Sequence, residues 1–391
     1  MRLQNNAKGE IPMIYLDNSA TTKPYPEVVD TFQKVAEQYY ANPSSIHRFG
    51  SEAERLLLQS KKQAAQLLKI AAEEVIFTSG GTEGNNIAIK GIALEHQNRG
   101  KHIITSQIEH PSVLEACASL EKLGFEITYL PVTEAGEVRL EDVKESIRQD
   151  TILITIMSVN NELGTIQPIY EIGQVVKQHP KLFFHVDHVQ GLGKLELDFY
   201  ECGIDLCTMS GHKIHGLNGT GALFIKKGTR LFPLHHGGGQ EGAYRAGTEN
   251  LPGIVSFVKA LRLIMEQKQT ELSNLKNLNR RLREKLEQNR FVIINSPKDA
   301  APHIVNISVP GFKPEVVIHA LGEKNIFIST MSACSSKRAD QSAVLAACRL
   351  REDRTTSALR VSLSYHTTQK EIEIFGSELA NVLTELNKVM G

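Results

Sequence analysis

The sequence lacks any long apolar run. Its 391 residues are 41% hydrophobic, yet no stretch approaches the roughly 18 apolar residues that a membrane-spanning helix needs. This absence excludes a membrane span, and the length predicts a soluble globular protein of about two domains.

Net charge is also absent, because 44 basic residues balance 44 acidic ones. We therefore expect no membrane partner and no direct nucleic-acid binding, leaving only a local patch for any polyanion.

Cysteine is scarce and odd in number, and no pair has the CxxC spacing of a metal ribbon. This argues against a disulfide framework and favours a reducing compartment, so we expect the protein in the cytoplasm. The first twelve residues are polar and resemble neither a secretory signal nor an anchor, which predicts a loose extension before Met13. The five cysteines are Cys117, Cys202, Cys207, Cys334 and Cys348.

Short β-branched runs alternate with helical patterns through the first two thirds of the chain, which predicts an α/β fold with a wound, mostly parallel, seven-stranded sheet. Helices are expected at 82–94, 111–123 and 169–178. The runs lie at 75–78, 102–105, 127–130, 151–157, 182–186, 206–209 and 222–225.

The composition changes after a glycine-rich segment at 235–247, where a long charged helix is expected at about 251–289. Beyond it, strands near 292–294, 304–309 and 359–362 and helices near 314–321 and 370–390 indicate a smaller α+β domain. We expect residues 25–255 to form a large domain that binds a cofactor. Residues 1–24 and 256–391 would form the small one.

Unusual polar clusters follow the predicted strands, each at the strand's carboxyl end. In open α/β sheets these ends line the ligand crevice, so the clusters predict a single site. They lie at 78–85, 108–110, 158–164, 185–190 and 210–213.

Two of these clusters carry Asp187 and Lys213. Either residue alone would usually be a turn residue or a solvated charge. Together they suit a cofactor that bonds an amine through an aldehyde and pairs its pyridinium with a carboxylate. That cofactor is pyridoxal 5'-phosphate, with Lys213 as the Schiff-base amine.

A glycine-rich turn, Gly80-Gly81-Thr82, joins a predicted strand to a helix, where backbone N–H groups can bind a phosphate. Taken alone, it is more often an ordinary turn in which Thr82 caps the helix. It lacks the GK[ST] ending of a nucleotide loop, which disfavours ATP and GTP.

The histidines raise two questions, whether His110 takes part in chemistry and whether the others bind a metal. His110 follows a strand, so it can stack on a flat ring or move protons, although a capping or core role is equally common. A metal site is not expected, because the other histidines lack carboxylate or cysteine partners at tight helical spacing. These histidines are at 185, 188, 212, 215, 235 and 236.

Together with the segments 15–22 (YLDNSATT) and 41–47 (ANPSSIH), these motifs resemble cysteine desulfurases of the NifS/IscS type. That family lies within the class V aminotransferases, which are fold type I pyridoxal phosphate enzymes. The resemblance runs from about Met13 almost to the C-terminus. It implies L-cysteine as substrate, alanine as product and a homodimer as the working assembly.

The resemblance also assigns a nucleophile, Cys334. Its neighbours Ser332, Ser335 and Ser336 are small and polar, and Lys337 and Arg338 follow, which predicts an exposed loop with local positive charge that favours the thiolate. On the residues alone, a reactive and an inert thiol are equally expected. Of the other cysteines, Cys117, Cys207 and Cys348 lie in apolar runs and are expected to be buried.

For the cofactor, the resemblance implies a phosphate site made by Gly81, Thr82, Ser210, His212 and Thr248 of the partner subunit.

For the ring and the substrate, the resemblance implies that Asn161 and Gln190 contact the ring oxygen or the substrate. Arg360 would clamp the substrate carboxylate with its forked donors, assisted by Asn42. His110 would serve as acid or base.

The implied reaction moves sulfur from cysteine to Cys334 as a persulfide and then to a protein acceptor. That acceptor is an iron–sulfur scaffold, a tRNA-thiolating enzyme or a cofactor-synthesis protein. A selenocysteine lyase or another class V lyase is an alternative, and so is a catalytically silent scaffold. Two residues depart from the family pattern: His188 and Met331 stand where small residues are usual.

Overall fold

A computed structural model describes residues 13–330 and 341–390 and divides the chain into two compact units. The larger unit comprises Thr21–Asn160 and Thr165–Thr270. The smaller unit takes in the described parts of Met1–Ala20, Asn161–Gly164 and Glu271–Gly391. The units change over at Thr270, inside a long helix, whereas the sequence suggests a boundary at residue 255. The expected domain division stays a prediction.

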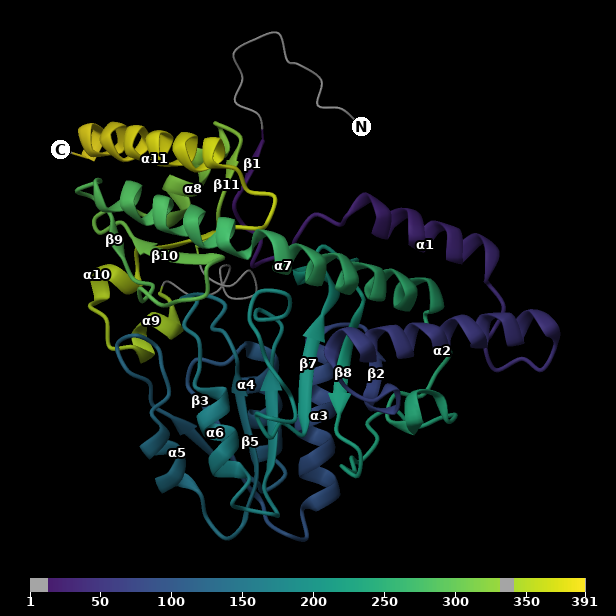
Figure 1. Ribbon diagram of the computed structural model, residues 1–391. Helices are drawn as coiled ribbons and strands as arrows, with labels where there is room; N and C mark the ends of the chain where they lie inside the picture. Colours follow the sequence, from purple (N-terminus) through teal and green to yellow (C-terminus); the bar gives the residue numbers. More distant parts are fainter. Residues whose placement is uncertain (1–12, 331–340, 391) are drawn as a thin grey trace. The chain divides into compact units, whose positions relative to one another are not determined.

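The larger unit is built on a seven-stranded sheet (Figure 1). Only β8 runs antiparallel to its two neighbours, so the sheet is mostly parallel as expected. Each strand begins and ends within one residue of a predicted run. In spatial order the strands are β2 (Val75–Thr78), β8 (Gly221–Ile225), β7 (Leu206–Ser210), β6 (Phe183–Asp187), β5 (Thr151–Met157), β3 (His102–Ser106) and β4 (Glu126–Leu130).

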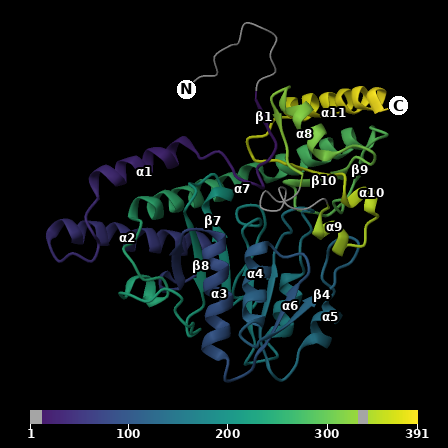
Figure 2. The same cartoon turned by 180° about the vertical axis from the view of Figure 1, so that it is seen from behind.

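Helices α3 (Gly81–His96) and α4 (Pro111–Glu121) lie side by side on one face of this sheet, in front of the strands in Figure 2. Their apolar residues join the strands in one core. Because both faces of the sheet are covered, most central strands are buried along their whole length, as expected for continuous β-branched runs. The core includes Ile87, Ile89, Ile92, Ile103, Val113, Leu153 and Leu223.

Two histidines are built into the interior of this sheet. His185 of β6 contacts Thr155 of β5 through Nδ1 at 2.8 Å and Thr208 of β7 through Nε2 at 2.9 Å. His102 of β3 bridges hydroxyls of β4 and β5 in the same way. Burial lowers the pKa of His185 to about 3, so this histidine is a neutral core residue.

Further helices complete the larger unit. They are α1 (Pro26–Gln38), α2 (Arg48–Leu68), α5 (Leu140–Ser146), α6 (Ile169–Val176), the 3-10 turns η1 (Ala72–Glu74), η2 (Gly211–Lys213) and η3 (Gln240–Ala243), and the first part of α7 (Leu251–Glu287). Helices α6 and α7 match the sequence prediction, whereas α1, α2 and α5 were not anticipated.

The smaller unit contains an antiparallel sheet in the order β12-β10-β9 and a parallel pair, β1 with β11. No described helix combines the length and apolar character needed to cross a bilayer. The elements of the smaller unit are β1 (Ile14–Tyr15), the last part of α7, β9 (Ile293–Ile294), β10 (Ile304–Ser308), α8 (Pro314–Gly322), β11 (Ile326–Phe327), α9 (Ala343–Ala347), α10 (Glu352–Thr355), β12 (Ala358–Ser362) and α11 (Gln369–Met390).

Candidate active site

The carboxyl edge of the large sheet gathers the predicted polar clusters. Strands β2, β3, β5, β6 and β7 all end at this edge, and β8 begins there because it runs in the opposite direction. The register places Thr78, Gly221 and Ser210 in one row across β2, β8 and β7. The loops that follow these strands therefore converge, as expected for an α/β crevice.

The glycine turn after β2 forms an anion-type cradle. Gly80 has a φ of +147°, and a Cβ on Gly81 would lie 2.9 Å from Val189 Cγ2, so neither position readily accepts a side chain. Helix α3 begins at Gly81 with Gly80 as N-cap and no side-chain cap, which excludes the alternative that Thr82 caps it. Its first-turn N–H groups are thus left for a ligand.

Ser210 completes this cradle. Its Oγ is buried without a hydrogen-bond partner in the part of the chain that the structure describes, and a Cβ built on Gly80 would lie only 3.6 Å from it. A buried hydroxyl without a partner costs free energy, and a phosphate oxygen would satisfy it. The cradle therefore fits the phosphate of pyridoxal phosphate.

Asp187, the last residue of β6, is 6% exposed and held by two donors. Its Oδ1 accepts a hydrogen bond from the N–H of Val189 at 3.0 Å. Its Oδ2 accepts from Asn85 Nδ2 on helix α3 at 2.8 Å. The carboxylate is thus oriented by groups from two different elements, which suits a fixed partner for a pyridinium nitrogen.

A hydrogen-bond chain links Asp187 to His110. Asn85 Nδ2 also donates to Ser112 Oγ at 2.8 Å, and Ser112 Oγ lies 2.8 Å from His110 Nδ1. The N–H of Ser112 donates to the same Nδ1 at 3.1 Å, so His110 caps helix α4 through this nitrogen. Because a backbone N–H can only donate, Nδ1 must accept, and the neutral ring carries its proton on Nε2.

Burial lowers the pKa of His110 below its usual value. The negative charge of Asp187 opposes this shift, and the positive charge of Lys213 adds to it. Together with the two donors on Nδ1, these effects favour the neutral imidazole at neutral pH. The three predicted residues His110, Asp187 and Lys213 therefore lie within electrostatic reach of each other.

Ser112→Ala is expected to raise the pKa of His110, because it removes the hydroxyl that stabilises the neutral ring. If neutral His110 is the active form, the acid limb of the kcat profile moves to higher pH, by about half to one unit. The measurement is kcat against pH. Ser119→Ala is the matched control, since Ser119 lies on the same helix and bonds only the carbonyl of Ala116. An acid limb that stays in place would show that Ser112 does not set the pKa of His110.

Lys213 ends the short turn η2, directly after β7. The turn is anchored from two sides: the carbonyl of His212 accepts from both the N–H and the hydroxyl of Thr22, and the carbonyl of Lys213 accepts from Lys194 Nζ at 2.8 Å. Burial, with the positive charges of Lys213 and other neighbours, lowers the pKa of His212 to about 4. His212 is therefore a neutral imidazole beside the predicted cofactor amine.

His188 is explained by its contacts. Its Nδ1 lies 2.8 Å from Ser158 Oγ, and that hydroxyl also contacts the carbonyl of Asp187 at 3.3 Å. A Cβ on Gly191 would lie 2.4 Å from the His188 ring, so the glycine makes room for it. Burial lowers the pKa of His188 to about 3. The ring therefore braces the loop after β6 and places no positive charge beside Asp187.

The smaller unit holds the predicted carboxylate clamp, Arg360 of β12. The side chain is 1% exposed, and its Nη1 donates to the carbonyl of Asn161 at 2.9 Å. Its Nη2 pairs with Asp17 Oδ1 at 2.9 Å, while its buried Nε has no partner among the described residues. Asn161 belongs to this same unit, in the segment Asn161–Gly164. Arg360 and Asn161 are thus brought together.

Cys334 and Met331 lie outside the described residues, but both flanks of their segment are anchored. Ser329 pairs with Arg360 through two backbone hydrogen bonds, of 2.7 and 3.2 Å. Ser342 Oγ donates to Glu162 Oε2 at 2.6 Å, and its N–H donates to the carbonyl of Thr355. Ser329 therefore lies beside the arginine clamp.

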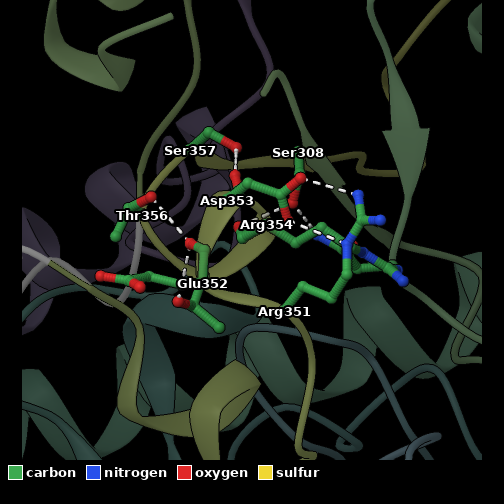
Figure 3. Close-up of polar contacts among 9 residues, drawn as sticks. Ser308, Arg351, Glu352, Asp353, Arg354, Thr356 and Ser357 are labelled. Carbon is green, nitrogen blue, oxygen red and sulfur yellow. Dashed lines mark hydrogen bonds and ion pairs between the residues drawn. The ribbon is translucent and has the colours of Figure 1, made fainter. Parts of the chain in front are cut away.

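Helix α10 lies just before β12 in the chain, and Figure 3 shows the polar contacts that hold this helix. Ser308 Oγ of β10 donates to the carbonyl of Arg354 at 2.8 Å. The hydroxyls of Thr356 and Ser357 donate back to carbonyls of Glu352 and Asp353. These contacts fix the entry into the strand that carries Arg360.

The remaining predicted residues differ in exposure. Asn42 is exposed, and its Oδ1 accepts from the N–H of Ser44. Thr248 is also exposed, at a place where nearby Arg245 bonds Glu83 of helix α3 at 3.1 Å. Gln190 is buried in the loop after β6.

Sequence reasoning placed Asn85 and Glu109 in the polar clusters without giving them a role, and it did not single out Ser112. Asn85 and Ser112 link Asp187 to His110, and buried Glu109 accepts from Ser106 and from the N–H of Met157. Desolvation raises the pKa of Glu109 to about 8. Lys194, which holds Lys213, was also missed. A signal existed for it: a single lysine amid the apolar and glycine residues of 191–195.

The mostly parallel sheet, with the glycine cradle, Asp187 and Lys213 all at its carboxyl edge, is that of a fold type I pyridoxal phosphate enzyme. The model of the aminotransferase class-V family matches residues 14–375. The chain belongs to this family and, within it, to the cysteine desulfurases of the NifS/IscS type. Pyridoxal phosphate is the cofactor of the family.

Relatives support this placement over nearly the full length. A NifS/IscS-type homologue of Lactobacillus delbrueckii is 42% identical over 380 residues, covering 96% of this chain and 99% of its own. The cysteine desulfurase IscS of Dictyoglomus turgidum is 40% identical, covering 96% of each chain. A solved structure of a NifS-like protein superposes with a TM-score of 0.90 at 32% identity, over 95% of this chain and 100% of that one.

Proposed function

We propose that this chain removes sulfur from L-cysteine, releases alanine and holds the sulfur as a persulfide on Cys334 before an acceptor takes it. The observation that carries the proposal is the cluster of Lys213, Asp187 and His110 at one sheet edge, in which Asn85 and Ser112 link Asp187 to His110 and Lys213 lies within electrostatic reach of His110. The named desulfurases among its relatives support the same activity.

Pyridoxal phosphate, when bound, supplies an aldehyde that bonds an amine and a ring that accepts the electron pair of a labilised bond. In our proposal Gly81, Thr82, Ser210 and His212 hold its phosphate. Asp187 keeps the ring nitrogen protonated.

At the reacting end of the cofactor, Lys213 is the amine that bonds the aldehyde and later moves the α-proton of the substrate. Gln190 and Asn161 contact the ring oxygen or the substrate. His110 is the proposed acid or base at this end of the site, where its Nδ1 accepts from the N–H of Ser112.

Arg360 is proposed to bind the substrate carboxylate, with Asn42 assisting. The buried Nε without a partner leaves one donor of the guanidinium available in the described residues. Asp17 already occupies Nη2, so the substrate carboxylate would compete with this ion pair or bind beside it. A forked guanidinium suits such a carboxylate better than a lysine would.

Cys334 is proposed as the nucleophile, and the other cysteines support this assignment by their inertness. All four are buried. Burial raises the pKa of Cys117 and of Cys348 to about 12 and that of Cys207 well above its usual value. A thiolate is the reactive form, so these thiols are poor nucleophiles at neutral pH.

The sulfur acceptor is proposed to be a protein: an iron–sulfur scaffold, a tRNA-thiolating enzyme or a cofactor-synthesis protein. The compartment is proposed to be the cytoplasm, which the four free cysteines favour. Pull-down with persulfide-loaded enzyme would identify the acceptor.

We also propose a homodimer, in which Thr248 of the partner subunit contacts the cofactor phosphate. Large apolar side chains on α1, on α2 and between them are exposed in the single chain, which suits burial against a second copy. They include Phe32 at 37%, Tyr40 at 77%, Ile46 at 102% and Leu58 at 51% exposed. Light scattering would measure the mass.

The proposal is tested by mixing the purified, cofactor-loaded protein with L-cysteine and a reductant. We expect a yellow protein that releases sulfide and alanine in equal amounts. Selenocysteine is the comparison substrate, and turnover of selenocysteine alone would favour the lyase alternative. A colourless protein that binds acceptors without releasing alanine would favour the silent scaffold.

A further inference from the structure

Lys194 is a buried lysine to which the proposed reaction gives no role. It is 8% exposed and lies in the tight turn that follows β6. Its Nζ makes one hydrogen bond, to the carbonyl of Lys213 at 2.8 Å, and no ion pair among the described residues. A buried ammonium without a carboxylate is costly, so a chain that keeps one needs a compensating reason.

The turn that presents Lys194 is tightly constrained. Gly193 has a φ of +70°, and a Cβ there would lie 2.5 Å from Ile264 Cγ1 of helix α7. The N–H of Lys194 donates to the carbonyl of Gly191 at 2.9 Å. The path of the backbone is therefore set by glycines and by α7, and it directs the lysine stem toward the turn η2.

The charged and titratable groups around Lys194 are nearly all basic. Lys213 and His212 come from η2, His188 from the loop after β6, and Lys268 from α7. Glu196, two residues further along the chain, pairs with Lys268 at 2.7 Å. Burial, with the positive charge of Lys213, lowers the pKa of Lys194 to about 7.

We propose that Lys194 is a positioning residue for the cofactor-binding lysine: its Nζ holds the carbonyl of Lys213, and its proton sets the charge beside the Lys213 amine near neutral pH. This inference rests on the proposed function of Lys213. A protonated Lys194 disfavours a second positive charge, so it keeps the Lys213 nitrogen in its neutral, nucleophilic form. Above neutral pH this influence fades, and the two groups titrate as a coupled pair.

The chain provides a matched control in Lys268. This lysine is buried as well and donates to the carbonyl of Leu195 at 2.8 Å, only one residue along from Lys194. It differs in two respects: it bonds no part of η2, and it has Glu196 as counter-ion. Lys194→Met and Lys268→Met therefore remove equivalent atoms, but only the first touches Lys213.

The test is a pH titration of the visible absorbance of the cofactor-loaded enzyme, which reports the proton on the Lys213 nitrogen. In Lys194→Met we expect the midpoint to rise by about one pH unit, because a neighbouring positive charge is gone. We also expect kcat to fall about tenfold, with little change in KM for cysteine. Lys268→Met should lower the melting temperature and leave the midpoint in place.

A second measurement needs no cofactor. In the apo protein, the rate at which acetic anhydride labels Lys213 reports its neutral fraction, and mass spectrometry reads the product. We expect slower labelling at pH 7 in Lys194→Met than in the wild type. Unchanged labelling and an unchanged midpoint would overturn the role of Lys194. A wild-type protein that never becomes yellow would instead count against the proposed function. The labelling rate in the apo protein would still test whether Lys194 controls the charge of Lys213.

Discussion

Lys213→Ala is expected to abolish the visible absorbance of the cofactor-loaded protein and to lower cysteine turnover by at least about a thousandfold. The physical reason is that one amine performs two tasks, bonding the aldehyde and moving the α-proton. No described lysine can replace it from its position, since Lys194 points its Nζ at the carbonyl of Lys213. The measurement combines an absorbance spectrum with alanine release.

The control for this variant is Lys227→Ala. Lys227 is an exposed lysine after β8, and its ion pair with Glu73 is a surface contact of 3.6 Å. Its removal should leave spectrum and turnover unchanged. If Lys213→Ala keeps the wild-type spectrum, Lys213 is not the amine that bonds the cofactor.

Cys334→Ala is expected to retain the cofactor spectrum while sulfur transfer falls to background. The variant still binds cysteine through the same groups, but it lacks the thiolate that attacks the substrate sulfur as the carbon–sulfur bond breaks. The remaining thiols are buried, with raised pKa values, so they cannot substitute. Persulfide on the enzyme, measured by mass spectrometry after one turnover, is the readout.

Cys202→Ala provides the matched control. Burial raises the pKa of Cys202 more than any neighbouring charge does, and we expect this variant to form persulfide at the wild-type rate. Persulfide formation in Cys334→Ala at an unimpaired rate would place the nucleophile elsewhere.

The large sheet was predictable because its signal is local. Runs such as 151–157 are apolar or β-branched throughout, and the strand is buried along its whole length. Strands β1 and β11 were not predicted because each has two residues, too few to show the alternating pattern of a strand. Helix α2 was not predicted either, because charged and polar residues dominate most of its faces. Its buried positions Ala53, Leu57 and Ala64 do follow helical spacing.

The site was predictable where its residues follow strands and unpredictable where they meet across the fold. Asp187 ends strand β6 and Lys213 lies in the turn that follows β7, so position alone identifies them. The bond from Asn85 to Asp187 joins residues 102 positions apart, and the bond from Asn85 to Ser112 spans 27. Such pairs depend on how α3 packs against β6 and α4, and a single sequence carries no trace of that packing.

The reversed direction of β8 has a consequence for how the chain reaches its native state. Because Ser210 pairs with Gly221, residues 211–220 form a closed hairpin loop that contains Lys213. Closing a loop of this length costs little chain entropy, and contacts so local in sequence form early. Asp187 depends instead on a long-range closure with α3. The hairpin that carries the amine can therefore close before Asn85 fixes Asp187, and assembly of the cofactor site ends with the slower, non-local contacts, which include that of Thr22 with this loop.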